Sequence, residues 1–233
     1  MGSRYVVERP WSRRVRGLPG LSLSLAAAAL VLQLWPGAVD HLAYVPGALA
    51  RGEWWRLLTC HLVHWSWDHV VWDAGTFLLI GAWCERAGRR PLLLALLLSG
   101  LAIPPVVLAV QPQLSAYAGL SGWDVALYAL LVARLLRERW PTGDAAVRLV
   151  LVLFAGALVA KVGYELATGG LWFVRSHEGV FVPVPMAHVV GACVGLLVGW
   201  AGAARGVDRG AAAAARARLG TVGPSGLGAR APQ

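Results

Sequence analysis

Apolar residues dominate six stretches of the chain, each about the length of a membrane-spanning helix. These stretches lie near residues 18–36, 67–84, 91–110, 121–137, 147–166 and 185–203. A helix needs about 20 predominantly apolar residues to cross the hydrocarbon core of a bilayer. The pattern therefore predicts an all-α membrane protein built as a bundle of six transmembrane helices.

Two of the six stretches are interrupted by polar side chains. The stretch 67–84 carries Asp68, His69 and Asp73, and the stretch 121–137 carries Asp124 and Arg134. Polar groups at membrane depth are costly, and they usually face the interior of a bundle or a cavity. We therefore expect these two helices to carry functional residues.

Composition and charge placement agree with a membrane protein. Only 14% of the residues are charged and the mean hydropathy is +0.60, whereas a soluble domain has about 25% charged residues. Of the 21 basic residues, 17 fall on one side of the predicted bundle and three on the other, with Lys161 inside the fifth helix. The positive-inside rule then places both termini in the cytoplasm. The net charge of +9 thus reflects topology and contact with the lipid bilayer, and no nucleic-acid partner is expected.

The chain divides into one membrane domain and two basic flanks. We expect a cytoplasmic segment over 1–17, the membrane domain over 18–203 and a disordered cytoplasmic tail over 204–233. The first apolar stretch also resembles a signal peptide, but no convincing cleavage site precedes Tyr44, so its retention is expected. The three cysteines have no spacing that indicates a disulfide framework or a metal motif.

Ser121 lies in the sequence AYAGLSGWDVALYAL, where an apolar loop meets the fourth helix. One interpretation is an N-cap, in which Ser121 and Asp124 form a capping box. However, the apolar part of this helix, 125–133, spans only about 14 Å, far less than the ~30 Å of hydrocarbon. Residues 114–120 must then enter the membrane as irregular backbone, which would place Ser121 in a hydrated pocket.

His188 begins a face of small residues on the sixth helix. Gly191, Gly195 and Gly199 follow it within one arc of the helix, and the fourth helix has its own face of small residues: Gly122, Ala126, Ala129 and Ala133. Such faces allow close helix packing, which would bring His188 to Ser121. Either residue alone has a structural interpretation, but together they indicate a nucleophile and its base.

Three motifs, in order, resemble the rhomboid intramembrane serine proteases. GLSG at 119–122 resembles their nucleophile motif, and AHVVGACVG at 187–195 resembles the motif on their last core helix. GEWWRLLTCHLVHWSWDHVVWD at 52–73, with GAWCER at 81–86, resembles their first loop and second helix. The resemblance covers about 18–203 and implies a rhomboid-like six-helix bundle. GEWWRLLTCHLVH looks most like the bacterial rhombosortase branch, which is associated with cleaving C-terminal Gly-Gly sorting signals.

The resemblance assigns a role to each motif residue. Ser121 would be the nucleophile and His188 the general base, with packing in place of a third carboxylate. The oxyanion donors would be the N–H of Ser121 and the side chain of His69, with Gly119 as part of this support. The family has an asparagine donor where this chain has Asp73.

Asp73 invites two hypotheses, because an ionised carboxylate would repel an oxyanion. It either donates a hydrogen bond in its protonated form, or it pairs with His69, four residues earlier, and keeps that ring cationic. Either role predicts that Asp73→Ala lowers kcat. The same departure leaves open a catalytically inactive relative that binds transmembrane clients.

Two further groups receive structural interpretations. His61, His64 and His69 do not share one helix face, and the sequence offers no cysteine or carboxylate that completes a usual zinc set, so neither metal nor cofactor is expected. Lys161 and Glu165, four residues apart, are expected to form an ion pair near the outer interface.

These observations favour a serine endopeptidase that cleaves a membrane-anchored, exported protein. The enzyme would reside in the bacterial cytoplasmic membrane, with its active site open to the outer, periplasmic face. The alternative is the inactive client-binding relative. A transporter fits less well, because the chain has no inverted repeat.

Overall fold

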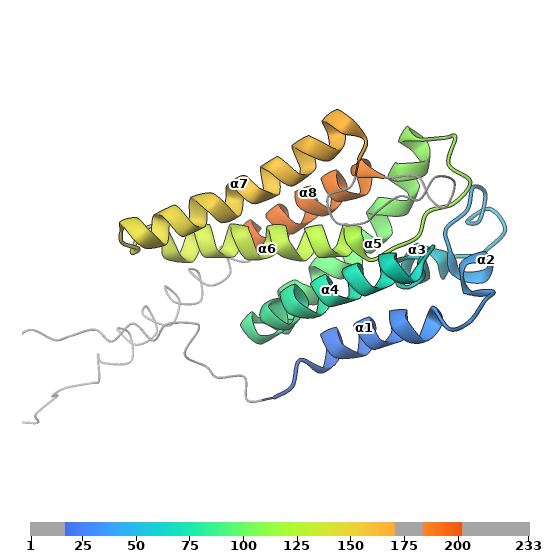
Figure 1. Cartoon of the computed structure of the whole chain (residues 1–233), viewed down its shortest axis with the longest axis horizontal. Coiled ribbons are helices and arrows are strands. Elements are labelled where there is room, and N and C mark those ends of the chain that lie inside the picture. Colours follow the sequence, from blue (N-terminus) through green and yellow to red (C-terminus); the bar gives the residue numbers. More distant parts are fainter. Residues whose placement is uncertain (1–16, 171–183, 202–233) are drawn as a thin grey trace, which may run out of the picture. The chain divides into compact units, whose positions relative to one another are not determined.

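The computed structural model describes residues 17–170 and 184–201. The predicted basic segment, apart from Gly17, and the predicted tail lie outside the described residues. Within that part of the chain the elements are helices joined by loops, with one isolated antiparallel bridge between Tyr44 and Tyr117. In chain order the helices are α1 (Gly20–Leu32), α2 (Ala38–Leu42), α3 (Arg56–Thr59), the 3₁₀ helix η2 (Cys60–Leu62), α4 (Trp67–Ala87), α5 (Arg89–Val110), α6 (Ser121–Arg139), α7 (Ala145–Thr168) and α8 (Pro185–Ala201) (Figure 1).

Each predicted apolar stretch corresponds to one long helix, within four residues at either end; these helices are α1, α4, α5, α6, α7 and α8. Within the described ranges, α5 and α7 are long and apolar enough to cross a membrane, whereas α1 and α8 are apolar but shorter. The helices α4 and α6 are continuous, but the polar residues named above interrupt their apolar sequences. The all-α fold is therefore confirmed, and the number of membrane crossings stays a prediction.

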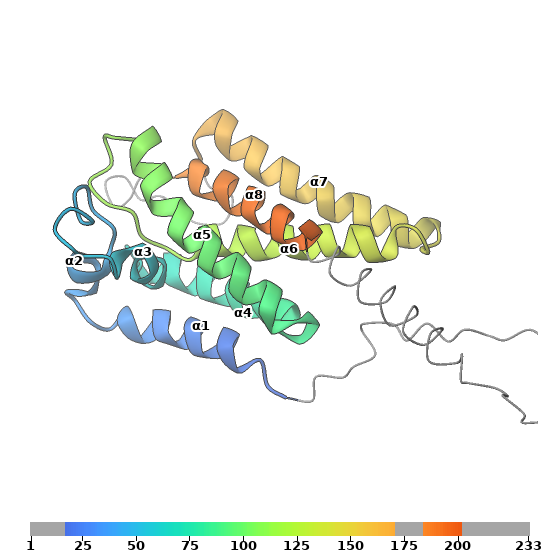
Figure 2. The same ribbon diagram turned by 180° about the vertical axis from the view of Figure 1, so that it is seen from behind.

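The helix α6 lies at the centre of the packed helices. Figures 1 and 2, which view the molecule from opposite sides, both show it between α4 and α7. Eleven of its residues are buried, in a nearly continuous run from Gly122 to Ala133. Leu127 and Leu130 pack in one core cluster with Phe77 of α4 and Leu92 of α5. Its polar residues are therefore tolerated because protein, and not lipid, surrounds them.

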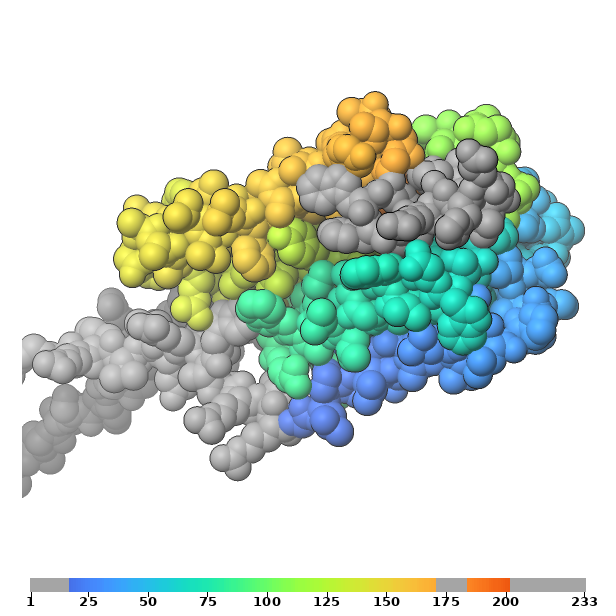
Figure 3. Space-filling view, viewed as in Figure 1, coloured from blue at the N-terminus to red at the C-terminus, as the bar shows by residue number. Residues whose placement is uncertain are grey.

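The helix α7 has the opposite character. Of its 24 residues only Leu151, Leu158 and Glu165 are buried, and α7 forms an open surface of the molecule in Figure 3. Large apolar side chains are exposed along α7, including Leu149, Val152, Leu153, Val159 and Leu166. An apolar surface of this extent is unfavourable in water and suits contact with lipid chains.

Helices α6 and α8 pack backbone against backbone, as their small residues predicted. A Cβ added at Gly191 would meet the carbonyl oxygen of Gly122, and one at Gly195 would meet that of Ala126. At Gly199 the nearest atom would be the Cβ of Ala133, 2.7 Å away. Only glycine permits so close an approach, so these three residues place the first turn of α8 beside the start of α6.

The segment that precedes α6 is irregular and packed inside the protein, in agreement with the sequence. Tyr117 pairs with Tyr44 through two main-chain hydrogen bonds, and the N–H of Gly119 donates to the carbonyl oxygen of Cys60. The N–H of Leu120 donates to Nε2 of His64 at 3.2 Å. The loop before α4 therefore satisfies the backbone of this segment and fixes the position of Ser121.

Candidate active site

Ser121 and His188 line one cavity of about 290 Å³, together with side chains from α4, α6, α7 and α8. His69 and Asp73 lie in the same lining. The structure thus brings these four sequence-predicted residues together in one cavity, and their catalytic roles stay predictions. The full lining consists of His69, Trp72, Asp73, Thr76, Ile80, Ser121, Asp124, Val125, Tyr128, Ala157, Leu158, Lys161, Glu165 and His188.

Ser121 is the first residue of α6 and not its N-cap. Leu120 occupies the N-cap position, and its side chain makes no capping hydrogen bond. The capping-box interpretation of Ser121 and Asp124 is therefore wrong. Instead, the main-chain N–H of Ser121 donates to Oδ2 of Asp73 at 3.0 Å. The carboxylate belongs to α4. It therefore bonds an N–H that has no partner within α6, although the two residues are far apart in the sequence.

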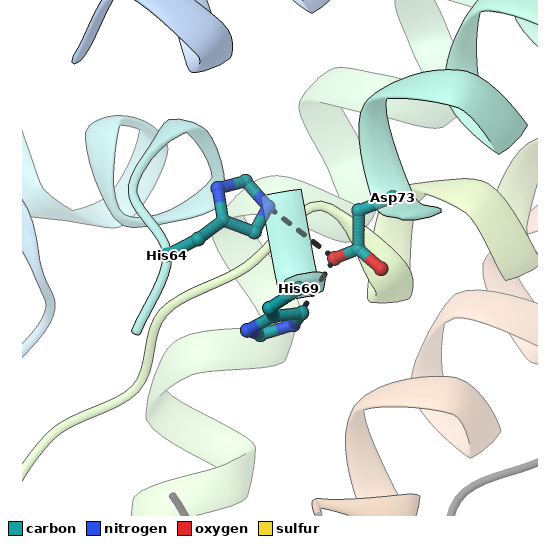
Figure 4. Close-up of side chains that lie close together, drawn as sticks. All are labelled: His64, His69 and Asp73. Atoms are coloured by element: carbon teal, nitrogen blue, oxygen red, sulfur yellow. Dashed lines mark ion pairs between the residues drawn. The ribbon is translucent and has the colours of Figure 1, made fainter. Parts of the chain in front are cut away.

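Oδ2 of Asp73 is the point on which several polar groups converge (Figure 4). It lies 3.2 Å from Nε2 of His69 and 3.3 Å from Nε2 of His64, besides the N–H of Ser121. The two expected oxyanion donors, His69 and the N–H of Ser121, thus meet at one oxygen atom. That atom marks a position where an anionic oxygen is held in the resting structure.

Gly119 gives this region the space it needs. Its φ of +123° lies in the range that L side chains rarely adopt, and an added Cβ would stand 3.1 Å from Nε2 of His69. The same Cβ would lie 3.5 Å from Oδ2 of Asp73. Glycine is therefore required at this position for two reasons: its backbone conformation and the close approach of the His69 ring.

The structure corrects the expectation that no carboxylate joins the histidines at positions 61, 64 and 69. Asp73 does so, and ligand atoms of His64, His69 and Asp73 all lie within 4.8 Å of one another. However, Nε2 of His64 already accepts from Leu120, and Oδ2 of Asp73 already accepts from Ser121. Burial lowers the pKa of His64, which favours a neutral ring with a single accepting nitrogen. A cation would have to displace these hydrogen bonds, so the set is better suited to orient the nucleophile loop.

His188 has a carboxylate partner that the sequence did not reveal. Its Nδ1 lies 2.5 Å from Oε2 of Glu165, and Oε1 of Glu165 accepts from Nζ of Lys161 at 2.5 Å. The predicted ion pair between Lys161 and Glu165 is therefore confirmed, but it does not stand alone. The expectation that packing replaces a carboxylate beside His188 is wrong. No local signal was available, because Glu165 and His188 lie on different helices.

Asp124 faces the same cavity from the first turn of α6. It is only 6% exposed, and within residues 17–170 and 184–201 its Oδ1 finds no hydrogen-bond partner. The sequence placed it at the start of the helix correctly but gave it a capping role. It is instead a buried carboxylate beside the candidate nucleophile.

Comparisons with known proteins show the family of the chain. Residues 51–205 match the rhomboid domain, a range that contains Ser121, His188 and every residue discussed in the site. The chain is 27% identical, over 179 residues, to the protein named "Putative rhomboid protease YdcA" of Bacillus subtilis (strain 168). This similarity covers 76% of the chain and 79% of the relative. With its helical fold and apolar outer helices, the chain is an integral membrane protein that belongs to the rhomboid family.

Proposed function

We propose that the protein is an intramembrane serine endopeptidase in which Ser121 is the nucleophile and His188 the general base. The observation that carries the proposal is that both residues line one cavity although they come from different helices. Close packing of α6 and α8 through Gly191 and Gly195 keeps the two helix starts together. A serine hydroxyl is a weak nucleophile until such a base is beside it.

The chemistry then follows the serine-protease sequence. Oγ of Ser121 attacks the scissile carbonyl carbon while its proton passes to Nε2 of His188, because Nδ1 is engaged by Glu165. The C–N bond breaks, the imidazolium protonates the leaving amine, and an ester to Ser121 remains. Water then attacks this ester, again giving its proton to His188, and releases the new carboxylate together with the free serine.

Two donors are available for the negative oxygen that forms in each attack. They are the N–H of Ser121 and Nε2 of His69, which already converge on one oxygen of Asp73. The carbonyl oxygen of the substrate would replace Oδ2 of Asp73 at this point, so the Asp73 side chain must move aside. One well-placed donor typically stabilises such a transition state by about 3–4 kcal/mol.

The substrate proposed is a membrane-anchored, exported protein whose cleaved segment unwinds at the outer face of the bacterial cytoplasmic membrane. A largely apolar lining, including Ile80, Val125 and Leu158, suits a segment drawn from lipid. Glycines lower the cost of unwinding a helix, which supports a C-terminal Gly-Gly sorting signal as the target. The placement of basic residues supports cytoplasmic termini and six crossings.

A second candidate function is a catalytically inactive relative that binds transmembrane clients. The observation that favours it is the carboxylate of Asp73 at the N–H of Ser121. A carboxylate fixed there would exclude the substrate carbonyl and repel the oxyanion. The two candidates differ in whether Ser121 is chemically activated.

A fluorophosphonate probe separates them. The full chain in detergent micelles is incubated with the probe beside Ser121→Ala and His188→Ala, with thermal unfolding curves to verify that each variant is folded. We expect rapid labelling of the wild type and loss of labelling in both variants. Folded wild-type protein that takes up no probe supports the client-binding function, and labelling that persists in Ser121→Ala rules out Ser121 as the nucleophile.

A further inference from the structure

A buried carboxylate connects the candidate base to a lysine. The side chain of Glu165 is 1% exposed, and its two oxygens contact different partners, Nδ1 of His188 and Nζ of Lys161, each at 2.5 Å. The Lys161 side chain is 24% exposed, whereas the side chains of Glu165 and His188 are buried. The row Lys161–Glu165–His188 thus runs from the edge of the cavity to the candidate base.

The protonation pattern of this row follows from donor and acceptor chemistry. An ammonium group only donates, and an ionised carboxylate only accepts. The contact with Lys161 favours the ionised form of Glu165, so the short contact to His188 requires a proton on Nδ1. Nζ of Lys161 lies 3.3 Å from the same Nδ1, but this lysine cannot accept that proton. The neutral ring must therefore carry its lone pair on Nε2.

We propose that Glu165 is a positioning residue that fixes the Nδ1–H tautomer of His188, and that Lys161 keeps Glu165 ionised for this purpose. This proposal rests on the proposed function, because it concerns how His188 serves Ser121. During attack the ring becomes an imidazolium, and the adjacent carboxylate stabilises that charge. The site is then a Ser121–His188–Glu165 triad in which Glu165 stays ionised throughout.

Packing supports the precision that such a role requires. The hydroxyl of Tyr128, on α6, donates to the carbonyl oxygen of Phe154, on α7, at 3.0 Å, and the two rings stack. Leu158 of α7 packs in a core cluster with Val125 and Ala129 of α6. The face of α7 that bears Glu165 is therefore held against α6, which carries Ser121. A purely stabilising ion pair would not need its carboxylate on the nitrogen opposite the reacting one.

The test replaces the carboxylate by its amide, Glu165→Gln, in the full chain in detergent micelles. The amide N–H can donate to Nδ1 and would move the ring proton to Nε2, the wrong tautomer for a base. We expect the rate of fluorophosphonate labelling to fall by roughly 10⁴-fold, the loss typical of this change in a full triad. Glu165→Asp keeps a carboxylate and should recover part of the rate.

Glu85→Gln is the matched control, because Glu85 is also a buried carboxylate whose two oxygens bond to different residues, Ser22 and Arg89. It is 3% exposed, accepts from the N–H and the hydroxyl of Ser22, both at 2.9 Å, and does not line the cavity. We expect this variant to lose thermal stability and to keep its labelling rate once folded. An equal loss of rate in Glu85→Gln and Glu165→Gln would overturn the positioning role.

A second readout reports the tautomer directly and does not depend on activity. ¹⁵N NMR of the His188 ring above pH 7 should show Nδ1 protonated in the wild type and Nε2 protonated in Glu165→Gln. A wild-type ring protonated on Nε2, or a Glu165→Gln variant labelled at the wild-type rate, overturns the proposal. If instead no probe reacts with the wild type while Nδ1 carries the proton, the proposed function fails and the tautomer assignment stands.

Discussion

The main-chain N–H of Ser121 donates a hydrogen bond to Oδ2 of Asp73 at 3.0 Å. This relationship joins the residue expected to attack the substrate to the residue that departs from the family pattern. Of the two hypotheses drawn from the sequence, the contact of 3.2 Å between Asp73 and His69 supports pairing with the histidine. The bond to Ser121 adds a third role, because the carboxylate occupies the proposed oxyanion position.

Because the Asp73 carboxylate lies at the N–H of Ser121, we predict that Asp73→Asn raises activity. The amide removes the negative charge that opposes the oxyanion and offers an N–H donor in its place. We expect the second-order rate of fluorophosphonate labelling to increase by about tenfold, which corresponds to ~1.4 kcal/mol. Asp73→Ala, which offers no donor, should be slower than Asp73→Asn. A rate for the asparagine variant below that of the wild type would indicate that the carboxylate assists the reaction.

His69 should contribute to the transition state and not to substrate affinity. Its Nε2 lies beside the same oxygen of Asp73 as the N–H of Ser121. Replacing His69 by Phe removes the donor while keeping an aromatic ring, so we expect kcat to fall by about 10²- to 10³-fold. The measurement is steady-state cleavage of a fluorogenic peptide that contains a Gly-Gly transmembrane segment. An unchanged kcat with an altered KM would assign His69 to binding instead.

The close contact of α6 and α8 predicts a large cost for one methyl group. In Gly195→Ala the new Cβ would meet the carbonyl oxygen of Ala126, a backbone atom that cannot rotate away. We expect the free energy of unfolding to fall by about 1–3 kcal/mol. We also expect Ser121 to be labelled more slowly. Denaturation by SDS in mixed micelles measures the first quantity.

Gly163→Ala is the matched control for this prediction. Gly163 also lies within a helix, α7, but no heavy atom of the described residues stands within 4 Å of its added Cβ. Its replacement should leave stability unchanged or raise it by up to ~1 kcal/mol, because alanine favours helix. Equal effects of the two alanines would mean that α6 and α8 are not in backbone contact.

His61, on η2 outside the long helices, should make stability depend on pH. Burial lowers the pKa of His61 to about 4, while an unfolded histidine titrates near ~6.5. Between these values the unfolded chain binds more protons, so the stabilising contribution is present above about pH 6.5 and declines as the pH falls to about 4. The full loss would be about 3 kcal/mol.

His61→Phe isolates this effect, because it keeps a ring to stack on Trp123 and removes the titrating group. The ring of His61 stacks on that of Trp123 at 4.5 Å. Thermal unfolding between pH 7.5 and pH 4.5 should show a shallower decline of Tm in the variant than in the wild type. Parallel curves for the two proteins would show that His61 does not carry the dependence.

The sequence by itself determined the helices and the family, and it predicted most of the candidate site. Hydrophobic periodicity and length located the six long helices, because a chain in lipid must satisfy its backbone within each segment. The motifs around Ser121 and His188 and the small residues of α6 and α8 predicted which helices meet. Gly119, His69 and Asp73 were placed at the oxyanion position by resemblance alone.

Only the tertiary structure decided which side chains bond to one another across helices. In the folded protein Asp73 bonds to the N–H of Ser121 and Glu165 bonds to Nδ1 of His188. Residue spacing along the sequence predicts neither contact. The physical reason is that helix periodicity specifies which face a residue occupies, whereas a hydrogen bond between helices depends on their relative rotation and shift to within an ångström or so. Those quantities are set by packing over the whole interface, including the contact of Gly191 with Gly122.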